Sequence, residues 1–191
     1  MPVSHSSTRV VLVPLKRFDA AKSRLRDQLT DDEVVELTMR LAAGVLEAAR
    51  PLLTVVVCDD DDVADFARRH GAEVFRSSAL GLNGSVDDAY RNLVDYDQVV
   101  VVHGDLRSPE GIGRFDPGEG VTIVTDQRRD GTNVLSLPGG LDFRFSYGPG
   151  SLHRHEREAA RLGLDCTVIA DSPWRFDVDE PDDLVQGPDG I

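Results

Sequence analysis

Short apolar runs that alternate with helix-like segments constrain the fold of this chain more than any other feature. Runs 9–15, 53–58 and 98–103 are rich in valine and leucine and show no alternation of apolar with polar residues. Such runs are typical of strands buried on both faces of a parallel sheet. The pattern predicts an α/β fold in which a single domain is built on a mostly parallel, doubly wound mixed sheet.

The segments between these runs carry helix signals. Thr30 and Glu33 fit a capping box, so a helix is expected from there to about Arg50, where Pro51 ends it. Asp59–Asp62 precede a short helix that Gly71 ends, and capping explains this acidic run. A strand is expected at 72–76. The segment 81–85 is expected to be a loop that enters a helix at about 85–94.

The second half of the chain is less regular. Strands are expected at 121–125, 133–137 and 164–170, and a helix at 151–162 with Ser151 as its N-cap. Pro181 would lie in the first turn of a terminal helix. We expect residues 1–8 and 186–191 to be loose ends of one domain, 9–185.

The charge balance excludes several classes of function. The 191 residues carry a formal net charge of −13, whereas nucleic-acid and anionic membrane surfaces need basic faces. No apolar run approaches the ~20 residues that span a bilayer. The two cysteines are far apart and lie in or at the end of expected strands. They are expected to be buried thiols of a cytoplasmic protein.

A basic loop follows the first strand and stands out in this acidic chain. Both lysines of the sequence, Lys16 and Lys22, lie there with Arg17, Arg24 and Arg26. A solvated charged loop is the ordinary interpretation. Because phosphates tend to bind where the strands of an α/β sheet end, we interpret the loop as a phosphate site that Lys22 and Arg24 contact.

Three aspartates form the second candidate group. Asp105 follows the fourth expected strand, and Asp177 and Asp179 alternate in an extended segment, which points both side chains the same way. If they converge, their oxygens suit Mg²⁺. The alternatives are a turn capped by Asp105 and a helix with an acidic first turn after Asp179.

Two further patterns have functional and structural interpretations. Gly81-Leu82-Asn83 would let the backbone approach a ligand, and Asn83 offers a donor and an acceptor to a base or ribose. A loop that only caps the next helix is the alternative. His153 and His155 are two residues apart on an expected helix, so they are a poor metal pair. The sequence contains no recognisable nucleophile–base motif.

Taken in order, these motifs resemble the 2-phospho-L-lactate/phosphoenolpyruvate guanylyltransferase family of coenzyme F420 biosynthesis. The resemblance covers about residues 9–184, and its more specific elements are Ala21–Leu25 and the pair Gly131–Asn133 and Gly148–Ser151. It implies a glycosyltransferase-A-like nucleotidyltransferase fold. It also implies transfer of GMP from GTP to a phosphorylated three-carbon acid, with release of pyrophosphate and with Mg²⁺ as cofactor.

The resemblance also assigns roles to residues of this chain. The Mg²⁺ ligands would be Asp105, Asp177 and Asp179, and the acceptor would be held by Thr132, Gly148 and Ser151. Catalytic contacts would come from Lys22, Arg24 and Asp105. The nucleotide would contact Pro14, Leu15, Lys16, Lys22, Ser23, Gly81, Leu82 and Asn83.

One segment departs from the family pattern, which usually reads Pro-Ala-Asp-Leu-Pro. Here it reads His103-Gly104-Asp105-Leu106-Arg107, which keeps the aspartate and places a cation, Arg107, near the expected metal site. The departure leaves the acceptor open between phosphoenolpyruvate, 2-phospho-L-lactate and another phosphate. A second alternative is that the protein binds a nucleotide without catalysing a reaction. The sequence does not decide between a monomer and a homodimer, or whether the product passes directly to the next enzyme.

Overall fold

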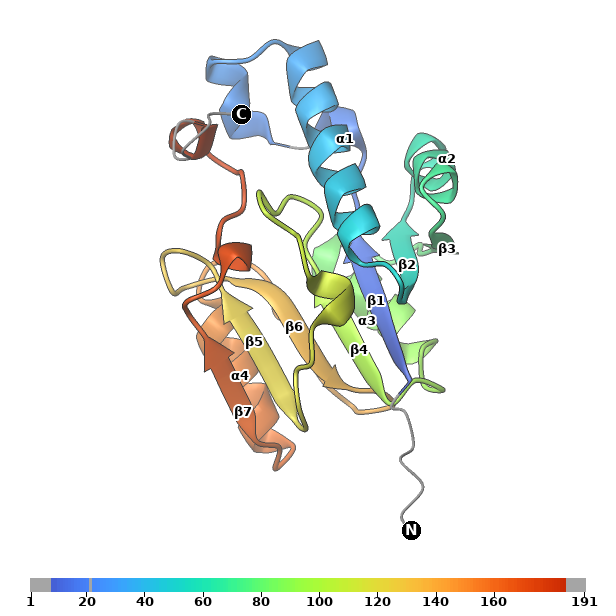
Figure 1. The fold of residues 1–191 in the computed structure, drawn as a ribbon, viewed down its shortest axis with the longest axis vertical. Coiled ribbons are helices and arrows are strands. Elements are labelled where there is room, and N and C mark those ends of the chain that lie inside the picture. The colour runs from blue at the N-terminus through green and yellow to red at the C-terminus, as the bar shows by residue number, and fades with distance from the viewer. Residues whose placement is uncertain (1–7, 21, 185–191) are drawn as a thin grey trace.

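Within the described residues, seven strands form one sheet in the order β3-β2-β1-β4-β6-β5-β7 (Figure 1). The structure is a computed structural model that describes residues 8–20 and 22–184. The strands are β1 (Arg9–Pro14), β2 (Leu53–Cys58), β3 (Glu73–Arg76), β4 (Gln98–Val102), β5 (Val121–Thr125), β6 (Thr132–Pro138) and β7 (Cys166–Ile169). The α-helices are α1 (Asp31–Ala48), α2 (Asp61–Arg69), α3 (Gly81–Arg91) and α4 (Ser151–Arg161).

The strand directions confirm the predicted mixed sheet. β1 pairs in parallel with β2 and β4, β2 pairs in parallel with β3, and β5 pairs in parallel with β7. Only β6 runs antiparallel to its neighbours, β4 and β5, among the strands described. The carboxyl ends of β1, β2 and β4 therefore meet at one edge of the sheet, where ligands bind in folds of this type.

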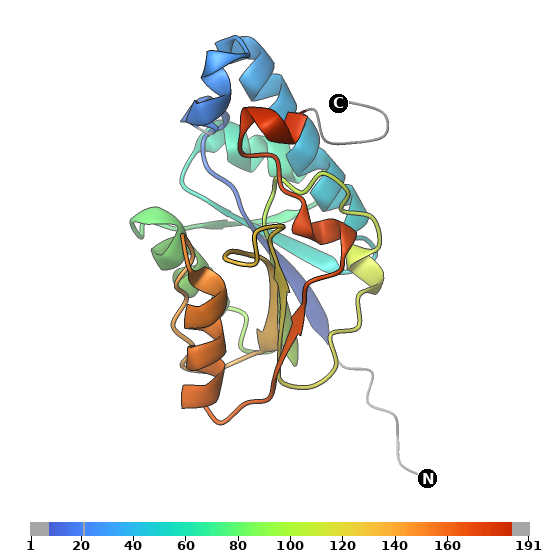
Figure 2. The same cartoon turned by 90° about the vertical axis from the view of Figure 1, so that its left-hand side faces the viewer.

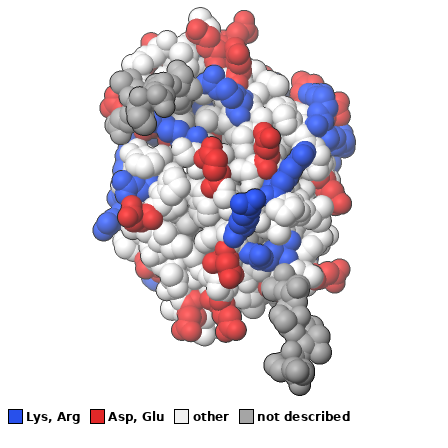
Figure 3. Space-filling model, in the orientation of Figure 1, with Lys and Arg blue, Asp and Glu red and all other residues white. Residues whose placement is uncertain are grey.

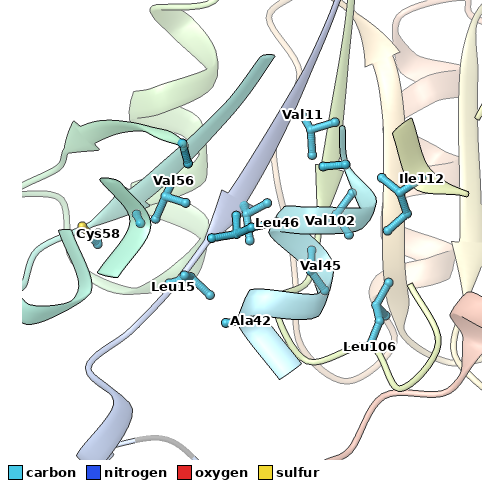
Figure 4. Packing of buried hydrophobic residues seen from close by; sticks show 14 of the residues in the cluster. Val11, Leu15, Ala42, Val45, Leu46, Val56, Cys58, Val102, Leu106 and Ile112 are labelled. Carbon is cyan, nitrogen blue, oxygen red and sulfur yellow. The ribbon is translucent and has the colours of Figure 1, made fainter. Parts of the chain in front are cut away.

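Helices cover both faces of the sheet (Figure 2). On β1, Val11 and Val13 belong to a core cluster with residues of α1 and α2, whereas Val10 and Leu12 pack in a second cluster with residues of α3 and α4. Figure 4 shows the first cluster, with Val45 and Leu46 of α1 among the strand residues. Because successive strand side chains point to opposite faces, the uninterrupted valine run fills two cores at once.

The helix termini confirm some of the predictions from the sequence and contradict others. The capping box at Thr30 is present, and Asp60 caps α2 by accepting from the amide of Val63. The 81–85 loop was predicted wrongly, since α3 already begins at Gly81. Ser151 is not an N-cap: Gly150 holds that position with a φ of 73°. A φ in this range strains residues that have a Cβ, so the glycine begins the helix.

Several short 3₁₀ helices complete the chain. The basic loop contains two, Phe18–Ala20 and Ser23–Asp27, and the expected terminal helix is a 3₁₀ helix, Pro181–Leu184. Two more lie at Ile112–Arg114 and Pro173–Arg175. The expected loose ends lie outside the described residues except for Thr8, whose backbone amide donates to Asp97 Oδ2 at 2.8 Å. Among the described helices, none has the length and apolar character needed to cross a bilayer.

Candidate active site

The segment after β4 and the segment before the terminal 3₁₀ helix lie side by side at the carboxyl edge of the sheet. Leu106 and Asp177 form an antiparallel bridge. On either side of it, the amide of Arg107 donates to Phe176 O at 2.9 Å and the amide of Val178 donates to Asp105 O at 3.1 Å. This pairing brings together two segments more than 70 residues apart in the sequence, and with them the predicted carboxylates.

The ammonium of Lys22 lies within this carboxylate group. Lys22 Nζ is 2.9 Å from Asp105 Oδ2 and 3.2 Å from Asp179 Oδ1, and it also donates to Val178 O. The Lys22 side chain is only 4% exposed, and its backbone has a φ of 52°, in the left-handed region. The sequence predicted that Lys22 would face phosphate, whereas here its charge is directed at the carboxylates.

The electrostatics of the group follow from burial and from these contacts. Burial alone would lower the pKa of Lys22, but the carboxylates of Asp105 and Asp179 raise it above its usual value. Burial alone would raise the pKa of Asp105, yet the Lys22 ammonium holds it below its usual range. Burial, reinforced by the carboxylates of Asp105 and Asp179, raises the pKa of Asp177 to about 7. Asp177 therefore lies in the same electrostatic cluster.

The three aspartates provide oxygen atoms, as a hard cation such as Mg²⁺ requires. Asp105 Oδ1 is buried and has no hydrogen-bond partner among the described residues, and Asp177 Oδ1 receives only a long contact of 3.4 Å from Asn133. As placed here, however, no three acidic, histidine or cysteine side chains in the described ranges are arranged to hold a metal ion. The Lys22 ammonium occupies the position between Asp105 and Asp179.

A cavity of about 500 Å³ opens beside this group at the strand ends. Its walls come from the end of β1, the basic loop, the first turns of α3 and the segment after β4. Of the predicted nucleotide contacts, the structure brings to the cavity Pro14, Leu15, Lys16, Lys22, Gly81 and Leu82. Asp105 and Asp179 line it as well. The side chain of Ser23 lies outside the part of the chain that the structure describes.

Gly104 fits the narrow space between the ends of β1 and β4. A Cβ at this position would lie 2.3 Å from Leu15 Cδ2, well inside van der Waals contact. Leu15 is itself buried, and both residues line the cavity. An alanine at position 104 would therefore require the end of the Leu15 side chain to move.

The other cations of the basic loop are mostly paired. Arg24 Nη1 lies 2.9 Å from Glu180 Oε1, and the Arg24 side chain is 70% exposed. Arg17 forms an ion pair with Asp19. Lys16 is exposed, lines the cavity and forms no ion pair with a described residue. Lys16 is therefore the lysine whose charge is free to meet a ligand in this structure.

Asn83 does not line the cavity, because its amide group is used elsewhere. Its Oδ1 accepts from the amide of Tyr147 at 2.6 Å, and its Nδ2 donates to Tyr147 O at 3.3 Å. This pair of bonds ties α3 to the loop that carries Gly148. In this structure the contact of Asn83 with a base or ribose is replaced by that structural role.

Two of the three predicted acceptor residues lie together in the protein interior. Thr132 and Ser151 are both buried, and their hydroxyl oxygens are 3.2 Å apart. Neither residue lines the nucleotide cavity, and neither does Gly148, which has a φ of 111° in the loop before α4. The structure thus brings Thr132 to Ser151, and the residue after Thr132, Asn133, contacts Asp177 Oδ1 through its Nδ2 at 3.4 Å.

Sequence reasoning missed His155, which organises this second group. Its Nδ1 lies 3.1 Å from Thr132 Oγ1, and its Nε2 accepts from the amide of Ser146 at 3.0 Å. Burial lowers the pKa of His155 to about 4, so the ring is neutral and its proton must be on Nδ1. The sequence did contain a signal for this contact. His155 follows Ser151 by four residues, so the two side chains lie on the same face of the helix.

The His103 ring also has a buried nitrogen without a hydrogen-bond partner among the described residues. Its ring centroid is 5.1 Å from that of Tyr147. His103 Nε2 and the Tyr147 hydroxyl are both buried without a hydrogen-bond partner in the described ranges. Arg107, two residues beyond Asp105, does not line the nucleotide cavity; it lines a different one, described below. The expectation that it adds a cation near the metal site stays a prediction.

Comparison with known proteins places the chain in a family. Residues 9–186 match the model of a family described as "Guanylyl transferase CofC like". The chain is 32% identical to a phosphoenolpyruvate guanylyltransferase of Rubrobacter xylanophilus, covering 92% of this chain and 91% of that protein. It is 31% identical to a 2-phospho-L-lactate guanylyltransferase of Archaeoglobus fulgidus, covering 92% and 81%.

A solved structure confirms the predicted fold. A nucleotidyl transferase from Methanothermobacter superposes with a TM-score of 0.64 at 16% identity, covering 95% of each chain. At this identity the likeness concerns the fold alone.

Proposed function

The chain belongs to the CofC-like guanylyl transferase family, and we propose that it transfers GMP from GTP to the phosphate of phosphoenolpyruvate or 2-phospho-L-lactate. Relatives at 32% and 31% identity carry these two names. The pathway would be that of coenzyme F420. The observation that carries the proposal is the apposition of a strand-end cavity of about 500 Å³ with the Asp105, Asp177 and Asp179 group.

In the proposed reaction, a phosphate oxygen of the acceptor attacks the α-phosphorus of GTP. The new P–O bond joins GMP to the acceptor, the bond between the α-phosphorus and its bridging oxygen breaks, and that oxygen leaves with pyrophosphate. Chemistry of this kind depends on positioning and charge neutralisation more than on a protein nucleophile. The absence of a nucleophile–base motif in the sequence is consistent with it.

The cavity offers two features suited to the nucleotide. Lys16 supplies an unpaired cation on one wall. On another wall α3 begins at Gly81 without a side-chain cap. Uncapped amides at a helix N-terminus favour phosphate oxygens. Together these features would hold the triphosphate beside Asp105.

Mg²⁺ is part of the proposal, with Asp105, Asp177 and Asp179 as its ligands. When bound, the ion would neutralise charge on the phosphates and stabilise the leaving pyrophosphate. The unpartnered Asp105 Oδ1 and the all-oxygen donor set fit such an ion. Lys22 would then have to release Asp105 and Asp179, and its ammonium would become available to the triphosphate at the same edge of the cavity.

For the acceptor, Thr132, Gly148 and Ser151 remain the proposed contacts. Because His155 Nδ1–H points at Thr132 Oγ1, and Ser151 Oγ also lies within hydrogen-bond distance, the Thr132 oxygen can accept both bonds. Its own proton is then free to be donated to an acceptor oxygen. His155 would act as a positioning residue by fixing this polarity.

The proposal is tested by incubating the protein with GTP, Mg²⁺ and each candidate acid while measuring pyrophosphate release. Release with phosphoenolpyruvate or 2-phospho-L-lactate supports it and identifies the acceptor. Release only with another phosphorylated acceptor would instead indicate a different nucleotidyltransferase. GTP binding without release under any condition would indicate a nucleotide-binding module. A cytoplasmic location, a homodimer and direct transfer of the product stay predictions.

A further inference from the structure

A second cavity, of about 570 Å³, lies on the face of the sheet that α1 covers. It is formed by the C-terminal half of α1 and the segment 106–114. In Figure 3, which looks onto this face, several blue side chains gather near its centre. The second cavity shares no lining residue with the nucleotide cavity, although α1 and the segment after β4 contribute different residues to each.

The charges around the second cavity are unlike those of the rest of the protein. Four arginines line it, against two glutamates, Glu47 and Glu110, in a chain whose net charge is −13. None of the four arginines (Arg40, Arg50, Arg107 and Arg114) forms a salt bridge with a described residue, and only Arg50 has a side-chain hydrogen bond there, to His70 O. Arginines that line one cavity without salt-bridge partners leave their positive charges available to an anion.

Arg107 adds an independent sign of a missing partner. Its Nε is buried and has no hydrogen-bond partner among the described residues. A buried donor left unpaired costs about 1–3 kcal/mol, so a ligand that accepts this hydrogen bond would gain affinity from it. The backbone of Arg107 is already fixed by its bond to Phe176 O at 2.9 Å.

The rest of the wall is apolar. Leu41, Gly44 and Ala48 of α1 line the second cavity together with Leu106 and Pro109, and a Cβ on Gly44 would lie 3.6 Å from Pro109 Cγ. Its volume falls within the range of small-molecule sites, about 300–1,000 Å³. Arginine forks match the oxygens of phosphate groups, and an apolar wall suits a carbon body.

We propose that the second cavity binds a small organic phosphate, with its phosphate on the arginines and its apolar part against α1 and Pro109. This site is separate from the nucleotide cavity, and it does not depend on the proposed guanylyl transfer. It would explain why an acidic protein keeps four arginines together on one face.

The chain carries its own reporter of this site. Trp174 is the only tryptophan in the sequence, and its Nε1 donates to Glu110 O at 3.1 Å. A methyl group placed on Gly111, which lines the second cavity, would lie 3.8 Å from the Trp174 ring. Occupation of the site should therefore change the fluorescence of Trp174.

The test is a titration of the full chain with phenyl phosphate, followed by Trp174 fluorescence and by calorimetry. We expect saturable binding that Arg40→Ala/Arg114→Ala weakens by at least about tenfold, because two charge-assisted contacts are lost. Arg68→Ala/Arg69→Ala, which removes two exposed arginines of α2, is the matched control and should leave binding unchanged. Lys16→Ala should also leave the fluorescence response unchanged.

Three results would overturn the proposal. The first is the absence of saturable binding, and the second is equal binding by the Arg40→Ala/Arg114→Ala variant and the wild type. The third is loss of the response in Lys16→Ala, which would place the ligand in the nucleotide cavity. Binding of inorganic phosphate as tight as that of phenyl phosphate would overturn the assignment of the apolar wall.

Discussion

Lys22 Nζ lies 2.9 Å from Asp105 Oδ2, although the two residues are 83 positions apart in the sequence. The same ammonium reaches Asp179 Oδ1 at 3.2 Å. A cation of the basic loop thus neutralises the carboxylates that we propose as metal ligands. The pair has a consequence for stability and for cation binding, because the metal and the ammonium would compete for the same oxygens.

Replacing Lys22 by methionine should lower stability and raise the response to Mg²⁺. Without the ammonium, Asp105 keeps a largely buried charge with no partner, so the free energy of unfolding should fall by about 2 kcal/mol. Mg²⁺ added without nucleotide should then raise the melting temperature of Lys22→Met more than that of the wild type, since the metal no longer displaces an internal cation.

Arg24→Met is the control for this experiment. Its ion pair with Glu180 is exposed, so its removal should cost less than about 0.5 kcal/mol and should not change the Mg²⁺ response. Equal Mg²⁺-induced shifts in Lys22→Met and the wild type would show that Lys22 does not occupy the cation position.

Asp105→Asn should abolish turnover while the fold is retained. The amide keeps the shape of the side chain but removes the charge that pairs with Lys22 and is proposed to bind Mg²⁺. We expect pyrophosphate release to fall by at least about 100-fold, with an unchanged far-ultraviolet circular dichroism spectrum. Asp182→Asn, an exposed residue of the nearby 3₁₀ helix, should stay close to wild type. Near-normal activity of Asp105→Asn would refute its assignment as a metal ligand.

Much of the fold could be predicted because its signals are local. The valine runs at β1, β2 and β4 and the capping box at Thr30 depend on neighbouring residues, and each gave an element at the expected place. Gly81 was harder, because a glycine with positive φ fits a loop as well as the first turn of a helix. The packing of α3 against the sheet decides between them.

The sequence predicted which residues lie at the carboxyl edge of the sheet, but it did not predict which of their side chains pair with one another. Asp105 and Asp177 lie in one electrostatic group, as their expected positions suggested, but the sequence placed Lys22 on phosphate and not on a carboxylate. The direction of the Lys22 side chain depends on a left-handed backbone and on Val178 and Asp179, more than 150 residues away. The pairing of Asn83 with Tyr147 also joins residues that are distant in sequence, 64 positions apart. Contacts of this kind are set by tertiary packing, which no local pattern encodes.

Gly104→Ala should be destabilising, and a second substitution should relieve the effect. The new Cβ would lie 2.3 Å from Leu15 Cδ2, so the end of the Leu15 side chain has to move, and because that end is flexible we expect a loss of about 1 kcal/mol, at the lower limit for overpacking. Leu15→Ala alone leaves a void. In the double variant Leu15→Ala/Gly104→Ala the void and the added methyl compensate, so the loss in unfolding free energy should be smaller than the sum of the two single losses. Strict additivity in chemical denaturation would contradict this contact.

The stability of the protein should fall in mild acid partly through His155. Its pKa is about 4 in the folded protein and about 6.5 when unfolded, so between these values the unfolded state binds a proton that the folded state excludes. The contribution of the neutral ring is complete above pH 6.5 and is lost as the pH falls toward 4, reaching up to about 3 kcal/mol. His155→Gln removes the titrating group, so its unfolding free energy should decline less steeply across this window. His153→Gln, an exposed change on the same helix, should keep the wild-type slope. Urea titrations at several pH values give the unfolding free energy as a function of pH. If this free energy changes equally steeply with pH in His155→Gln and in the wild type, His155 is not held neutral by the Thr132 and Ser146 contacts.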